Sequence, residues 1–266
     1  MPIKIACIGC SWTEGERLPY EKTISYPEAL YNLLSQTMPD ISVYNCGIGG
    51  TSAKLHKILY TWVIKQIKPD FIIHQITDIC RTQITNDESI SKAFNIQQPN
   101  NDKQYYKISI SQDKWAIVPV LDFLGLPLKD DKHGDIKTYY DRYFKNNPIF
   151  TFEKFLDICR YKYHFERESE ANHLDYIADI DYILKYNNKL LSFFWNDNML
   201  NFYSEHQKNY SKVIENNFVS IENHFKTIGK NIFDYSHDKW MHLNTNGNQI
   251  VANFIKDELI KKKVIG

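Results

Sequence analysis

The sequence has no long hydrophobic run and no excess of charge of either sign. Its 266 residues include 32 Lys and Arg against 32 Asp and Glu, so the formal net charge is zero. This balance gives no electrostatic reason to expect nucleic acid or an anionic membrane as a partner. No apolar run reaches the ~18 residues that a membrane span needs, and the first, residues 3–8, is too short for a secretory signal. We expect a cytoplasmic protein without a membrane span.

The sequence also lacks a cysteine framework. Five cysteines form an odd set with no regular spacing, which is typical of reduced thiols in a cytoplasm. Cys7 and Cys10 make a C-x-x-C pair, but no second pair or nearby histidine pair completes a zinc site. The loop after residues 3–8 has no glycine series that cradles phosphate, which disfavours a nucleotide binder. We therefore predict no metal and no cofactor.

Short apolar runs alternate with amphipathic stretches at both ends of the chain. Buried strands are expected at residues 3–8, 41–44, 70–76, 190–195 and 231–233. Helices are expected at residues 27–38, from 51 or 52 to about 67, along an apolar face from 213 to 228 that ends at Gly229, and at 244–262. This alternation predicts an α/β fold, a flavodoxin-like three-layer sandwich with a five-stranded parallel sheet. Ligands of such sheets bind at the carboxyl ends of the strands.

The alternation is lost between residues 82 and 189. We interpret this stretch as an insertion between strands three and four of a single domain over residues 1–266. An insertion of this length suits a lid, a substrate-shaping cap or an oligomer surface. Within it, we expect a hairpin between residues 107–110 and 115–121 and helices at 152–163 and 174–186.

Polar residues follow the expected strands at the points where these strands end. Ser11 follows the first strand, and a glycine-rich turn over residues 45–52, here called the glycine turn, follows the second. The third strand ends in Gln75-Ile76-Thr77-Asp78, and the last gives way to residues 234–244. Because the carboxyl ends of parallel strands share one edge, we expect these groups to meet in one crevice. Trp12, Trp195 and Trp240 are expected to flank it, either as packing or as platforms for sugar rings.

These strand ends resemble the four sequence blocks of the SGNH (GDSL-type) hydrolase family. Residues 9–15 (GCSWTEG) are similar to its G-D-S-x-[ST]-x-G block, and residues 45–50 (NCGIGG) to N-x-G-x-x-G. Residues 75–78 (QITD) stand at its G-x-N-D block, and residues 239–244 (KWMHLN) at D-x-x-H-[PL]-[NT]. The blocks occur in the family order, and the middle of the chain has no counterpart.

The resemblance implies that Ser11 is a nucleophile and His242 the base that removes its proton, since a serine hydroxyl is a poor nucleophile alone. It further implies that the backbone N–H groups of Ser11 and Gly50 stabilise the oxyanion. Thr77 stands where the family has an Asn donor; its hydroxyl is a shorter donor, and Gln75, two residues earlier on the strand, is the alternative.

The orienting acid also departs from the family pattern. Lys239 stands three residues before His242, where the family has Asp. We favour Asp238 as the acid that holds the imidazole, with Asp234 or a Ser–His dyad as alternatives. Cys10 replaces the family Asp of the first block, which is usually structural, although a Cys10 nucleophile is a further alternative.

The resemblance implies a serine esterase or deacylase that forms an acyl-enzyme on Ser11 and acts on an O-acyl ester. We favour an acyl group on a carbohydrate, so the expected partner is a small-molecule or glycan acyl ester, and the oligomeric state stays open. One alternative is a polysaccharide O-acyltransferase that uses the same site. Another is a degenerate member that binds a glycan without turnover. Contact between the Ser11 hydroxyl and the His242 imidazole would favour an enzyme.

Overall fold

The computed structural model describes 14 segments of the chain: residues 2–15, 23–49, 51–77, 83–84, 94–98, 104–110, 118–119, 140–141, 151–154, 156–157, 170–185, 190–210, 219–237 and 242–266. The strands are β1 (Lys4–Gly9), β2 (Ser42–Gly47), β3 (Phe71–Ile76), β4 (Gln83–Ile84), β5 (Phe94–Gln97), β6 (Tyr105–Ile110), β7 (Val118–Pro119) and β8 (Leu190–Phe194). The helices are α1 (Ser11–Glu14), α2 (Tyr26–Leu34), α3 (Ala53–Gln66), α6 (Glu170–Lys185), α7 (Asp197–Tyr210), α8 (Ile221–Thr227), the 3-10 helix η4 (Ile232–Tyr235) and α9 (Thr245–Lys261). Among these, no helix has the length and apolar character to cross a bilayer.

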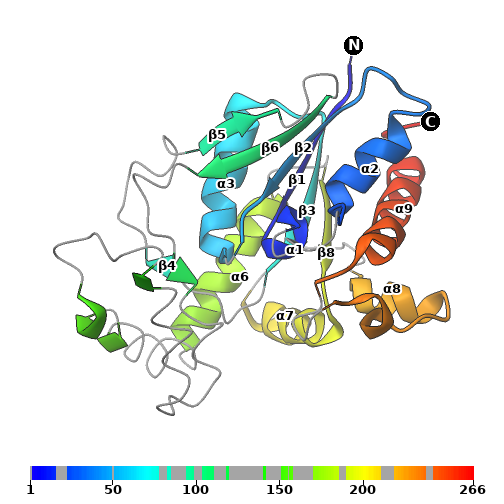
Figure 1. Ribbon diagram of the computed structural model, residues 1–266. Helices are drawn as coiled ribbons and strands as arrows, with labels where there is room; N and C mark the ends of the chain where they lie inside the picture. The colour runs from blue at the N-terminus through cyan, green and yellow to red at the C-terminus, as the bar shows by residue number, and fades with distance from the viewer. Residues whose placement is uncertain are drawn as a thin grey trace.

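The main sheet has six strands in the order β5-β6-β2-β1-β3-β8. The five strands from β6 to β8 run parallel, and β5 runs antiparallel to β6 at one edge. The central strands β1 and β3 are almost continuously apolar and buried, as parallel strands covered on both faces must be. In Figure 1, α2 and α9 lie together on one side of the sheet, and α3 packs against α6 on the other. The α/β architecture with helices on both faces is as predicted.

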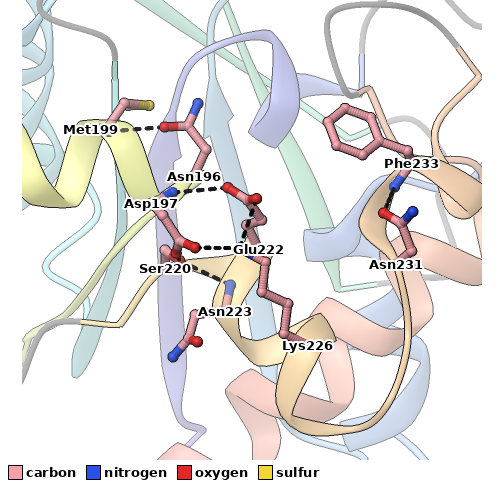
Figure 2. Close-up of polar contacts among 9 residues, drawn as sticks. All are labelled: Asn196, Asp197, Met199, Ser220, Glu222, Asn223, Lys226, Asn231 and Phe233. Atoms are coloured by element: carbon pink, nitrogen blue, oxygen red, sulfur yellow. Dashed lines mark hydrogen bonds and ion pairs between the residues drawn. The ribbon is translucent and has the colours of Figure 1, made fainter.

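Four of the five predicted strands correspond to β1, β2, β3 and β8, but the fifth is wrong. The segment that begins at Asn231 forms the 3-10 helix η4, because the Asn231 side chain accepts a hydrogen bond of 3.1 Å from Phe233 N and turns the chain (Figure 2). The fifth parallel strand is β6, which comes from residues 105–110 in the expected insertion. The sheet is therefore mixed and six-stranded.

The single long helix expected along residues 213–228 is also wrong. Ser220 forms a parallel bridge with Phe194, so the chain is extended just before α8 begins. The Ser220 side chain then accepts from Asn223 N at 2.9 Å and caps α8, as Figure 2 shows. α8 ends at Thr227 with Ile228 as its C-cap, and Gly229, the predicted end of the helix, follows with a φ of 71°, the left-handed conformation that glycine adopts readily. Residues 211–218 lie outside the described segments.

Ser220 also belongs to a polar cluster beyond β8 (Figure 2). Its hydroxyl donates to Asp197, whose carboxylate is paired with Lys226 at 2.6 Å. Lys226 also contacts Glu222 at 3.0 Å, and Glu222 accepts from the Asp197 N–H at 3.0 Å. The cluster joins the start of α7 to α8 and fixes the chain where β8 ends.

The middle of the chain supplies part of the sheet. The hairpin expected between residues 107–110 and 115–121 is wrong, because β6 pairs with β2 and β5, while β7 pairs with β4. The helix predicted at residues 174–186 is confirmed by α6. Residues 152–154 and 156–157 are helical, and the rest of the helix predicted there lies outside the described segments. A lid or cap role for residues 82–189 stays a prediction.

Candidate active site

The site begins at the turn that follows β1. Cys10 stands at the N-cap of the one-turn helix α1, and its carbonyl accepts from Thr13 N and Glu14 N at 2.9 Å each. Gly15 ends the helix with a φ of 75°. Ser11 is thus the first residue of α1. This helix follows the carboxyl end of the central strand β1 (Figure 1). Its side chain is buried, with 7% of the residue exposed.

Two glycines allow α1 to pack directly on the strand ends. A Cβ on Gly9 would lie 1.9 Å from Thr13 Oγ1, and one on Gly47 would lie 2.2 Å from Glu14 N. Neither contact is sterically possible, so any side chain at these positions would push α1 away. Packing therefore explains why glycines occur at these two positions of the motifs.

The side chain of Gln75, at the end of β3, holds the turn that follows β1. Its Oε1 accepts from Cys10 N at 2.9 Å and from Thr13 Oγ1 and Cys10 Sγ at 3.2 Å each. Its Nε2 donates to Ile76 O at 2.7 Å. This fully buried amide braces the turn that carries Ser11; its predicted part in oxyanion stabilisation stays a prediction.

His242 precedes α9 on a short antiparallel bridge between Ser236 and Leu243. His237 N donates to His242 O at 3.0 Å, on the same bridge. Asn244 then caps α9, its Oδ1 accepting from Gly247 N at 3.0 Å. These contacts explain the H-L-N-x-x-G pattern: the Asn begins the helix that fixes the position of His242.

The two predicted catalytic residues meet. His242 Nε2 lies 2.9 Å from Ser11 Oγ, although 231 residues separate them along the chain. His242 is buried as well, with 6% exposed. Next to them, Trp12 stacks on Trp195 with ring centroids 5.0 Å apart, and its ring centroid is 6.5 Å from that of His242. Both tryptophans are buried, which favours the packing interpretation over a sugar platform.

The other predicted site residues lie in different surroundings. Thr77 is buried and donates its hydroxyl proton to Thr51 O at 2.9 Å, while Tyr176 OH donates to Thr77 O at 2.8 Å. Asp234 is exposed on η4, and within the described segments no hydrogen bond joins its carboxylate to His242. Gly50, Asp238, Lys239 and Trp240 lie outside the described residues.

The motifs contain the residues that hold the glycine turn but did not reveal their contacts. Glu14 Oε2 accepts from Gly49 N, and Ile48 N donates to Gly9 O at 3.0 Å. Asn45 Oδ1 accepts from Gly47 N at 3.0 Å. Behind the turn, the buried histidines His56 of α3 and His74 of β3 are in contact with each other, and no pattern in the sequence predicted this contact.

In the part of the chain that the structure describes, no group of three His, Cys, Asp or Glu residues could hold a metal ion.

Comparison with known proteins gave similar solved structures. One is a variant of Axe2, an acetyl-xylooligosaccharide esterase from Geobacillus stearothermophilus, 16% identical with a TM-score of 0.49 over 97% of this chain and 94% of that one. Others are a two-domain esterase active on acetylated mannans (15%, 0.47, over 99% and 50%) and the lipase Lip_vut3 from a goat rumen metagenome (11%, 0.43, over 96% and 96%). No protein-family model and no curated protein matches.

Proposed function

We propose that this protein is a serine esterase of the SGNH type, in which Ser11 is the nucleophile and His242 the base. The observation that carries the proposal is the 2.9 Å contact between His242 Nε2 and Ser11 Oγ. A hydroxyl becomes a useful nucleophile when a base lies within this distance. The pair is buried at the carboxyl ends of β1 and its neighbours, where open α/β sheets bind their ligands.

The proposed reaction has two steps. His242 Nε2 takes the Ser11 proton as Oγ attacks the ester carbonyl, and the tetrahedral intermediate expels the alcohol, which receives that proton. Water then attacks the acyl-enzyme, again giving its proton to His242, and the acid leaves as Ser11 Oγ regains a proton. Both intermediates carry an oxyanion that fixed N–H donors must stabilise.

The N–H groups of Ser11 and Gly50 are the proposed oxyanion donors. Thr13 N and Glu14 N are bonded to Cys10 O, whereas the Ser11 N–H precedes the first hydrogen bond of α1. Gly50 follows Gly49, whose N–H is held by Glu14 of the same one-turn helix. The Thr77 hydroxyl proton already has an acceptor in Thr51 O, so we propose that these backbone groups provide most of the stabilisation.

The proposed substrate is an O-acyl group on a carbohydrate. The stretch from 82 to 189 is rich in Tyr and Phe, and we propose that it shapes the part of the crevice that binds the carbohydrate. Aromatic side chains bind the apolar faces of sugar rings. Acetylated mono- and oligosaccharides are therefore the substrates to compare with a simple ester such as 4-nitrophenyl acetate.

The test is intact mass after incubation with a serine-directed fluorophosphonate. The native protein should gain one adduct, and Ser11→Ala and His242→Ala should gain none. Ser35→Ala and His224→Ala are matched controls at positions outside the site and should label like the native protein. If the native protein stays unlabelled at a concentration that labels a known esterase, the proposal is wrong, and glycan binding becomes the function to assay.

A further inference from the structure

Behind the glycine turn, three buried polar side chains form a continuous line. Thr51 Oγ1 lies 2.8 Å from His56 Nε2, and His56 Nδ1 lies 3.2 Å from His74 Nε2. Thr51 is in the turn, His56 is on α3 and His74 is on β3, and none has any exposed surface. Burying a polar group costs free energy unless it is hydrogen-bonded, so each contact of this line must join one donor to one acceptor.

The Thr51 hydroxyl fixes the direction of the line. Its Oγ1 also lies 2.8 Å from Ile48 O, and a carbonyl oxygen can only accept. The single hydroxyl proton of Thr51 therefore points to Ile48 O. It follows that His56 Nε2 must carry a proton and donate it to Thr51 Oγ1.

The same reasoning extends to the second histidine. If His56 is neutral with its proton on Nε2, its Nδ1 accepts, and His74 Nε2 must donate. Complete burial lowers the pKa of His74 to about 3, so this ring is neutral and its own Nδ1 carries no proton. The opposite direction would leave a buried Nδ1–H donor on His74, and His74 Nδ1 has no hydrogen-bond partner among the described residues.

We propose that His56, as its Nε2–H tautomer, is a positioning residue for the glycine turn and thereby for the oxyanion donor that this turn carries. This inference rests on the proposed function, because the turn contains Gly50. On one side, Gly9 and Glu14, which flank Ser11 in the sequence, accept hydrogen bonds from the described part of the glycine turn. His56 holds it from α3, through Thr51, whose carbonyl also accepts from Thr77.

An oxyanion donor acts mainly in the transition state, so loosening it lowers kcat more than it raises KM. His56 touches neither Ser11 nor His242 in the described contacts. Its replacement should therefore change turnover per active site without changing the number of serines that a fluorophosphonate finally labels.

The test compares His56→Leu, His56→Gln and Val63→Ala with the native protein on 4-nitrophenyl acetate, with active sites counted by fluorophosphonate adduct. His56→Leu removes the donor to Thr51, and we expect kcat to fall ~10- to 100-fold with KM within ~2-fold, below the loss on deleting a donor outright. His56→Gln keeps an N–H donor and should restore most of the rate. Val63→Ala, a buried change on the same helix, should lower the melting temperature but keep kcat per site.

Histidine ¹⁵N NMR of the native protein reads the tautomer without any esterase activity. A protonated Nε2 and an unprotonated Nδ1 on His56 support the proposal, and the reverse assignment overturns it. Unchanged kcat in His56→Leu, with the native protein active, overturns the positioning role alone. A native protein that labels with no fluorophosphonate and cleaves no ester overturns the proposed function itself, so the two failures are distinguishable.

Discussion

At the scale of single residues, the site depends on a short contact between two side chains from opposite ends of the chain. In the proposed reaction the Ser11 proton moves to His242 Nε2, so the imidazole has to be held in the tautomer that leaves Nε2 free to accept it. Substitution of the nearby carboxylates can identify the group that holds the imidazole. Of the two carboxylates considered from the sequence, Asp234 is exposed on η4, and we propose Asp238 as the orienting acid.

We expect Asp238→Asn to lower kcat by about 10³- to 10⁴-fold, because an amide stabilises the wrong tautomer of the imidazole. Asp234→Asn is the matched control and should keep kcat within ~2-fold, since a change at an exposed side chain without a contact to the base has little effect. Steady-state kinetics on 4-nitrophenyl acetate measure both. Full activity in both variants would instead indicate a Ser–His dyad.

At the scale of elements, the geometry of the site depends on how closely one-turn and long helices approach the strand ends. The start of α9 packs on the Ser236–Leu243 bridge, and a Cβ on Gly247 would lie 2.9 Å from Leu243 Cβ and 3.0 Å from Tyr235 Cβ. The first distance is shorter than real Cβ contacts and the second is shorter than nearly all of them, so a side chain there must displace Leu243 and with it the bridge. His242 lies on that bridge, next to Leu243.

Gly247→Ala should therefore lower both stability and kcat, since it moves His242 relative to Ser11. Small-to-large changes in packed sites cost about 1–3 kcal/mol of unfolding free energy. Gly229→Ala is the control: its backbone has a φ of 71° and an added Cβ would meet nothing within 4 Å. It should lose a similar amount of stability, about 1 kcal/mol, through strain alone and keep its kcat. Urea unfolding and kinetics together separate the two variants, and equal kcat in both would contradict the packing argument.

The secondary structure shows what sequence patterns reveal and what they miss. β1, β3 and β8 are short, apolar and buried, so their continuous apolar runs were sufficient to predict them. β6 was predicted only as a local hairpin strand, because its residues (YYKISI) alternate as in a half-buried edge and give no sign of pairing with β2. At residues 231–233, the apolar pair Ile232 and Phe233 indicated a strand, and the side chain of Asn231 turned it into η4.

The candidate site followed from sequence where the residue type and the end of a strand coincided. Ser11 was predicted from its place after β1 and from the resemblance of its motif, His242 from the resemblance of residues 239–244, and the structure brings the two together. The brace by Gln75 and the line through His56 and His74 were not predicted as such, because they depend on contacts between elements. No local spacing in the sequence specifies which helix face will lie against which strand.

At the scale of the whole molecule, burial of a neutral histidine in the core links stability to pH. The pKa of His74 is about 3 in the folded protein because of burial, against 6.5 in a solvated chain. Below pH 6.5, the unfolded chain therefore binds a proton that the folded protein does not. The free energy of unfolding falls as the pH decreases through this window, from about 6.5 towards 3.

We expect His74 to contribute a slope of about 1.4 kcal/mol per pH unit between pH 6 and pH 4. His74→Gln keeps an N–H donor toward His56 but does not titrate, so its unfolding free energy should vary less with pH. Urea unfolding of both proteins at pH 4, 5, 6 and 7 measures the difference, in which the contributions of other groups cancel. Parallel pH profiles would show that His74 takes up no proton on unfolding.

The separation of 231 residues between Ser11 and His242 also determines when the proposed active site can form during synthesis and folding. Contacts of such long range require the closure of a very large loop, and they form after local structure has formed. On a ribosome, the N-terminal strands and α3 emerge long before His242 and α9. Serine reactivity should therefore arise only at the last stage of synthesis and folding, so that fluorophosphonate labelling reports completed folding as well as chemistry.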